Sequence, residues 1–133
     1  MSQLGINKIG RFDYSPLMAG DYPRAAVVVT LKAGQVYKPG SVLGMDDAGL
    51  CSLVDSAATD GTEKPYAVLV GSNRDSFEEV DATLADEIGV AYCTGEFARE
   101  FLIFGGADTW QTHERAARDV CMFFRKTATA PNQ

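Results

Sequence analysis

The hydrophobic positions between residues 25 and 104 fall into short extended segments separated by glycine, proline and aspartate. Residues 25–31 (AAVVVTL) form a nearly continuous β-branched run, which predicts a strand buried on both faces. Shorter apolar segments at 42–43, 50–54 and 66–70 are bounded by turn-forming residues. The pattern therefore predicts a mainly β, compact barrel-like or sandwich-like domain.

The segments between these strands predict turns and exposed loops. Residues 46–49 (DDAG) are typical of a hairpin turn, and the polar residues 55–64 predict an exposed loop. Residues 72–87 form the most acidic stretch, with Arg74 as its one cation, and predict a polar insertion. Residues 88–93 and 96–104 are expected to pair as strands that turn at Thr94-Gly95.

The C-terminal third predicts one short helix over about 108–118, followed by a closing strand over 120–124. Asp108 or Thr109 can cap this helix, and the small residues at 116 and 117 allow it to approach the sheet closely. In the closing strand, alternate side chains should face the core and a helix or neighbouring subunit. Core or subunit packing is therefore assigned to Trp110, Val120, Met122 and Phe124.

Residues 1–24 differ from the body, because their apolar positions keep neither a helical nor a strand period. The division expected is an arm at 1–24 and a β-rich domain at 25–133. The arm either packs irregularly on its own domain or becomes ordered when it meets a partner. Its candidate contact residues are Leu4, Ile6, Ile9, Phe12, Tyr14 and Leu17.

Composition and charge narrow the function classes. A chain of 133 residues suits a single domain, and its net charge of −6 should repel nucleic acid and anionic membranes. No apolar run reaches the ~20 residues of a membrane span, and the N-terminus does not resemble a secretory signal. Cys51, Cys93 and Cys121 are widely spaced and are expected to stay reduced and partly buried, as in a protein made in the cytoplasm.

Candidate chemistry is sparse. His113 is the single histidine, and it is expected on the surface of the helix. Ser41 follows a glycine directly in GSVLG, which is the wrong spacing for a nucleophile elbow. The acidic turns lack the alternating ligand spacing of a calcium loop. The sequence therefore predicts a protein that is not an enzyme and has no catalytic residues, cofactor or metal site.

The ordered set of segments resembles the head decoration proteins of tailed bacteriophages, the family typified by the small capsid-stabilising protein of phage lambda. The resemblance covers about residues 19–124. It is carried by AGDYP at 19–23, AG at 33–34, PGSVLG at 39–44, DG at 60–61 before AVL at 67–69, VAYCTGEF at 90–97 and the helix at 108–118. The longer N-terminal arm and the insertion at 72–87 depart from short lambda-type members.

This resemblance implies a mainly β domain that forms trimers on the outer face of the phage capsid. Such trimers bind the major capsid protein and clamp neighbouring subunits of the DNA-filled shell. In this reading the arm adds to a sheet edge on the capsid. Three alternatives remain open: a jelly-roll-type dimeric cement protein, a small β-barrel that binds sugar or peptide, and an undetected enzyme. The sugar-binding alternative needs clustered exposed aromatics, whereas Tyr66, Tyr92, Phe97, Phe101 and Phe104 are expected mostly in the core.

Overall fold

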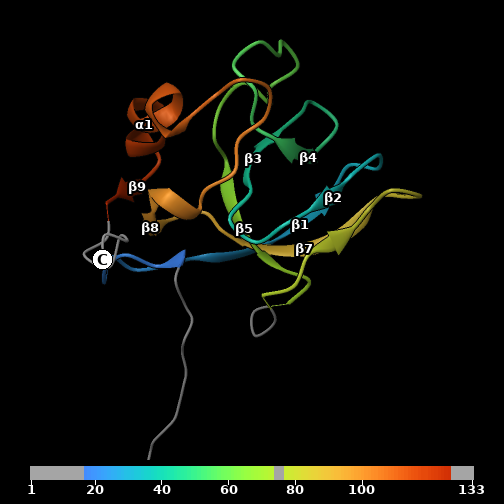
Figure 1. Cartoon of the computed structure of the whole chain (residues 1–133). Helices are drawn as coiled ribbons and strands as arrows, with labels where there is room; N and C mark the ends of the chain where they lie inside the picture. Colours follow the sequence, from blue (N-terminus) through green and yellow to red (C-terminus); the bar gives the residue numbers. More distant parts are fainter. Residues whose placement is uncertain (1–16, 74–76, 127–133) are drawn as a thin grey trace, which may run out of the picture.

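A closed barrel of five strands forms the centre of the protein in a computed structural model that describes residues 17–73 and 77–126 (Figure 1). Around the barrel the order is β1 (Ala26–Leu31), β4 (Leu50–Leu53), β3 (Val42–Met45), β5 (Ala67–Gly71) and β7 (Glu87–Tyr92). The β1–β4 pair is parallel and the other pairs are antiparallel. The mainly β, barrel-like fold predicted from the sequence is confirmed.

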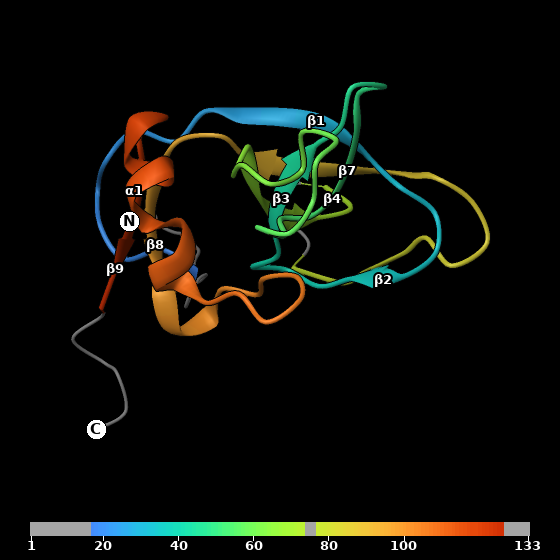
Figure 2. The same cartoon turned by 90° about the horizontal axis from the view of Figure 1, so that it is seen from above.

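A second layer covers one side of the barrel. It consists of the parallel pair β8 (Gly95–Ala98) and β9 (Met122–Arg125), a 3-10 turn at Arg99–Phe101, and α1 (Trp110–Asp119). Seen from above, α1, β8 and β9 lie together beside the barrel, while the short β2 (Val36–Tyr37) lies on its other side (Figure 2). There β2 pairs with β6 (Val80–Asp81).

The alternation of side chains along the barrel strands produces two separate cores. Inward-facing residues fill the barrel, and among them Leu31, Leu43 and Leu69 are fully buried. Outward-facing residues of the same wall, such as Val42 and Val68, pack against the second layer. That outer core also holds Phe97, Ala117 and Met122. The wall formed by β3 and β5 is therefore buried on both faces, as their apolar sequences require.

The prediction that residues 25–31 are buried on both faces is wrong. Val29 and Leu31 face the barrel interior, but Val28 on the opposite face is 70% exposed. The second layer does not extend over this part of the barrel. Local composition predicted the strand β1 correctly. Whether other elements cover its outer face depends on parts of the chain that are distant in sequence.

The prediction that residues 88–93 and 96–104 form one strand pair is also wrong. β7 pairs with β1 and β5, while β8 pairs with β9. Gly95 has a φ of 144°, which lets the chain leave the barrel between β7 and β8. The chain then turns through Arg99–Phe101, so residues 99–104 do not continue the strand.

The hairpin turn and the helix lie where the sequence placed them. The Asp46 carboxylate accepts the backbone N–H groups of Ala48 and Leu50 at 2.9 Å, which closes the β3–β4 turn. Thr109 is the N-cap residue of α1, and its N–H donates to Thr112 Oγ1 at 3.1 Å. The closing strand starts two residues later than expected, because Cys121 adopts a left-handed φ of 64° after the helix.

The loop at 55–64 is only partly exposed. Thr62 is buried against β3, where a Cβ on Gly44 would lie 2.5 Å from the Thr62 carbonyl oxygen. Glycine at position 44 is thus required for this close approach. The loop is therefore held against β3 at Thr62, while residues 56, 57, 59 and 60 remain exposed.

Candidate functional site

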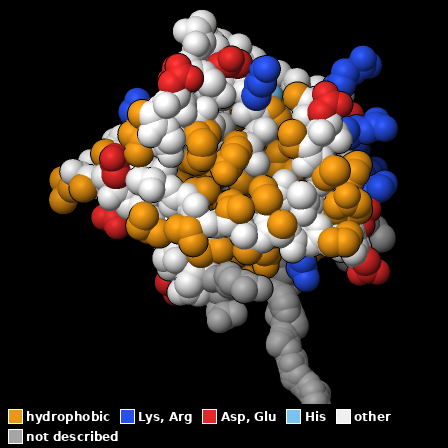
Figure 3. Space-filling model, turned by 180° about the vertical axis from the view of Figure 1, so that it is seen from behind, with side chains coloured by type: hydrophobic (Ala, Val, Ile, Leu, Met, Phe, Trp, Pro, Cys, Tyr) orange, Lys and Arg blue, Asp and Glu red, His pale blue; other side chains and the backbone are white. Residues whose placement is uncertain are grey.

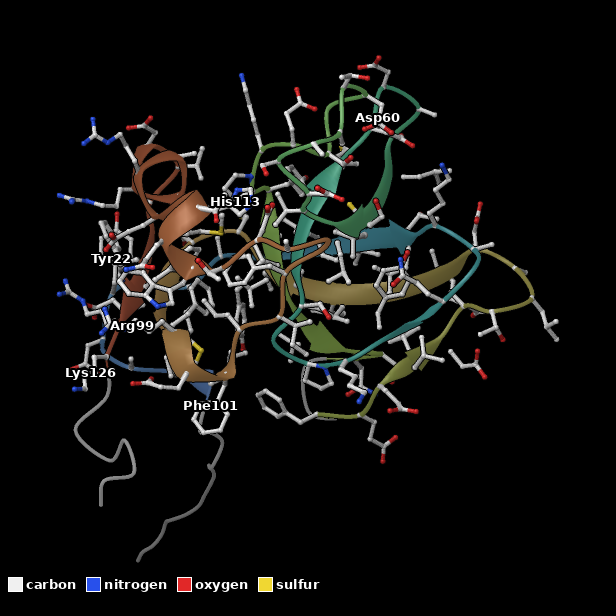
Figure 4. All side chains as sticks on the ribbon, turned by 45° about the horizontal axis from the view of Figure 1, so that its top comes forward. Tyr22, Asp60, Arg99, Phe101, His113 and Lys126 are labelled. Carbon is white, nitrogen blue, oxygen red and sulfur yellow. The ribbon has the colours of Figure 1, made fainter. Side chains whose placement is uncertain are left out.

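His113 occupies the interface between α1 and the rest of the domain. Its side chain is 3% exposed, stacks on Phe104 with ring centroids 5.6 Å apart, and points away from solvent (Figure 4). Nε2 lies 2.7 Å from Asp108 Oδ2. The expectation of a surface histidine is wrong, because α1 packs its His113 and Ala117 side against the outer core.

Asp108 links this histidine to the 55–64 loop. Ser56 donates to the Asp108 carboxylate twice, from its hydroxyl at 2.7 Å and from its backbone N–H at 2.6 Å. The carboxylate therefore lies between the serine and the histidine. In a hydrolytic triad the histidine lies between the serine and the acid, so that it can take the serine proton. The arrangement here joins the 55–64 loop to α1 through Asp108, and His113 contacts the acid and not the Ser56 hydroxyl.

These contacts lower the pKa of Asp108 below its ordinary value. The hydrogen bond from the Ser56 hydroxyl contributes most, burial opposes it, and the Ser56 N–H and His113 add to the lowering. Asp108 is consequently ionised near neutral pH and accepts hydrogen bonds. This suits a structural link between α1 and the 55–64 loop and does not suit a general acid.

The first described residues hold the incoming chain on the second layer. Leu17 is 4% exposed within the outer core, Met18 bridges to Phe97, and the Ala19 N–H donates to the Glu96 carbonyl oxygen at 3.0 Å. Leu17, which the sequence assigned to the contact residues of the arm, is instead part of the outer core. The other candidate arm residues, Leu4 to Tyr14, lie outside the described residues.

Glu96 adds a polar attachment beside this entry point. Its carboxylate accepts the Tyr22 N–H at 3.0 Å and pairs with Arg125 at 2.6 Å. These contacts lower the pKa of Glu96, the Tyr22 N–H being the largest cause. Residues 17–22 are thus fixed to β8 and β9, although the sequence grouped them with the arm.

The residues assigned to core or subunit packing separate into three environments. Met122 and Phe124 are buried in the outer core. Trp110 is half-buried against this core, and the Arg99 guanidinium lies 4.0 Å from its ring centroid. Val120 follows α1 and is 45% exposed, so it does not belong to the domain core.

The aromatic residues that were expected in the core divide similarly. Phe97 is fully buried, and Tyr92 and Phe104 pack at the edge of the outer core. Phe101 is 49% exposed and projects outward from the 3-10 turn (Figure 4), and Tyr66 is also exposed before β5. The expectation that these two are core residues is wrong. They lie on different elements and were not identifiable as exposed from local sequence.

An open groove runs beside α1. It encloses about 590 Å³ and is lined by Phe123 and by charged residues of the helix: Glu114, Arg115, Arg118 and Asp119. Residues 17–73 and 77–126 contain no cluster of His, Cys, Asp or Glu suited to hold a metal. Within the same residues, no helix is long and apolar enough to cross a membrane.

Comparison with known families identifies the architecture. Residues 8–121 match the model of bacteriophage lambda head decoration protein D. The chain belongs to this family. The match includes residues 8–16 before Leu17, the barrel and α1, and it ends next to β9. A search of curated proteins gives no match.

Membership of the head decoration family assigns the protein a structural role on the phage capsid. The family is not an enzyme family. Its assignment also favours the lambda-type architecture over the alternative jelly-roll cement protein, whose eight strands form two packed sheets. The five-stranded closed barrel observed here differs from that arrangement.

Proposed function

We propose that this head decoration protein binds the outer surface of the capsid as a trimer and clamps neighbouring major capsid subunits. The observation that carries the proposal is the family match over residues 8–121. Clamping stabilises the shell that encloses the packed DNA, and the role requires no catalysis or cofactor.

The proposed capsid contact is the part of the arm that precedes Leu17. Its apolar residues are Leu4, Ile6, Ile9, Phe12 and Tyr14. The domain supports such a contact because Leu17, Met18 and Ala19 fasten the chain to β8. A force on the arm is thereby passed to the outer core. An extended arm of this kind can add to a sheet edge on the capsid through its backbone.

Three arms on one trimer strengthen binding without new chemistry. Once the first arm is bound, the others meet their sites at high effective concentration, so the total affinity exceeds that of one arm. A dimer would supply two arms by the same reasoning. The negative net charge of −6 helps to keep the free protein soluble and separate from the genome.

Deletion of residues 1–16 tests the proposal. Residues 17–126 contain both cores, so the shortened protein should fold with an unchanged circular dichroism spectrum but no longer co-sediment with capsids. Deletion of residues 127–133 is the matched control and should leave binding intact. Capsids decorated with the control should release DNA at a higher temperature than undecorated ones. Unchanged binding after removal of residues 1–16 would contradict the assignment of the contact to the arm.

A further inference from the structure

The outer face of β1 and β7 is an apolar surface that residues 17–73 and 77–126 leave uncovered. In the antiparallel register of β1 and β7, three residue pairs lie opposite each other on this face: Ala26 and Tyr92, Val28 and Val90, and Thr30 and Ile88. Tyr92 packs at the edge of the outer core, whereas Val28 is 70% and Ile88 is 57% exposed. We call Ala26, Val28, Thr30, Ile88 and Val90 the β1–β7 face. It has no charged member.

The β1–β7 face is the continuation of a wall that is covered elsewhere. Outward-facing Val42 and Val68 of that wall lie beneath the second layer, but the layer ends at Tyr92. Figure 2 places β1 along one outer side of the barrel, and the view from behind shows apolar side chains gathered across the middle of the molecule (Figure 3). A contiguous apolar patch of this kind marks an interaction surface.

Charge on the two sides of this face indicates which partner covers it. On one side, α1, β9 and the following residue carry Arg115, Arg118, Arg125 and Lys126 against Glu114 and Asp119. On the other side, residues 77–87 carry five acids and no Lys or Arg, with Lys32 as a nearby cation. The five acids are Glu78, Glu79, Asp81, Asp86 and Glu87. In Figure 3 most of the blue side chains lie on the α1 side.

We propose that the β1–β7 face is the contact between copies of this chain, with the cationic side of one copy beside the acidic side of the next. Around a rotation axis, opposite sides of identical subunits meet, so this charge distribution is complementary to itself. The uncharged centre suits an interface between identical subunits, which is more apolar than transient contacts. The inference specifies the subunit surface of the oligomer in the proposed function, and it rests on that proposal.

Sedimentation velocity of the full-length protein tests the apolar part of the contact. Val28→Asp places a charge at the centre of the face and should weaken self-association by about tenfold or more. Ile88→Lys repeats the test on the neighbouring strand, in case Val28→Asp does not fold. Ala48→Asp is the control, because Ala48 is exposed in the turn between β3 and β4, outside the β1–β7 face and both of its charged sides. The control should sediment as the wild-type oligomer.

Charge exchange tests the orientation. Arg115→Glu with Arg118→Glu should weaken association, as should Glu78→Lys with Glu79→Lys. Combining all four changes in one chain should restore association, because each altered side then meets an altered side of the next copy. A combined variant that associates more weakly than either pair would overturn the head-to-tail arrangement.

The outcomes separate this inference from the proposed function. A folded Val28→Asp variant that keeps the wild-type oligomeric state would overturn the inference, and so would a wild-type protein that sediments as a monomer. If that monomer binds capsids and Val28→Asp abolishes binding, the face contacts the capsid and the decoration role stands. If Val28→Asp dissociates the oligomer but wild-type oligomers do not bind capsids, the inference holds and the proposed function fails.

Discussion

Replacing His113 measures how strongly α1 is fastened to the 55–64 loop. His113→Phe keeps an aromatic ring to stack on Phe104 but removes the donor to Asp108. His113→Gln removes the stacking ring but retains an amide group that can donate to the same carboxylate. The two variants therefore separate the hydrogen bond from the packing of the ring.

The expected cost of His113→Phe follows from the 2.7 Å contact. A hydrogen bond to a charged group contributes about 1.5–3 kcal/mol, and Asp108 keeps both donors from Ser56. We therefore expect a loss of about 2 kcal/mol in the free energy of unfolding. For a domain of this size that corresponds to a fall in Tm of roughly 6–8 °C. Gln111→Ala, on the exposed side of α1, is the control and should change the free energy of unfolding by less than about 0.5 kcal/mol.

The pH dependence supplies a second measurement. The pKa of Asp108 is lowered in the folded protein, so its ionised form contributes stability above its ordinary value of 3.8, and this contribution is lost as the pH falls through the lowered value. The stability gap between wild type and His113→Phe should be full at pH 7 and should shrink below about pH 4. Equal melting temperatures of His113→Phe and wild type at pH 7 would refute the reasoning, as would a gap that does not change with pH.

Two further predictions concern burial. Leu17→Ala should lower the free energy of unfolding by about 2–5 kcal/mol in denaturant titrations, because Leu17 is 4% exposed in the outer core. Leu84→Ala is the control and should have little effect, because Leu84 is 98% exposed. Equal losses in the two variants would mean that Leu17 is not packed in the outer core. Burial raises the pKa of the Cys51 thiol to about 11. At pH 8 a thiol reagent should therefore label at most Cys93 and Cys121 in the native protein, and it should reach Cys51 only after denaturation. Rapid labelling of Cys51 in the native protein would contradict its burial in the barrel.

The sequence by itself determined those features that depend on neighbouring residues. The DDAG turn at 46–49 follows from the Asp46 side chain binding backbone two and four residues on, and the start of α1 follows from Thr109 and Thr112. A run of β-branched residues located β1, because extended backbone accommodates them well, and short apolar segments bounded by turn residues located β3 and β5. Together with the ordered motifs, these local features were sufficient to indicate the head decoration family.

The tertiary structure alone decided which apolar faces are covered. Period-two alternation assigns Val28 and Val29 to opposite faces, but it contains no information about where α1, β8 and β9 will pack. The same limit explains the misplacement of His113, which is buried by Phe104 and by an acid that is itself held by Ser56. Burial depends on segments that are distant in sequence. The local pattern therefore predicted the strands and the helix. The second layer, the hydrogen bonds to Asp108 and the exposed β1–β7 face arose only from the packing of the whole chain.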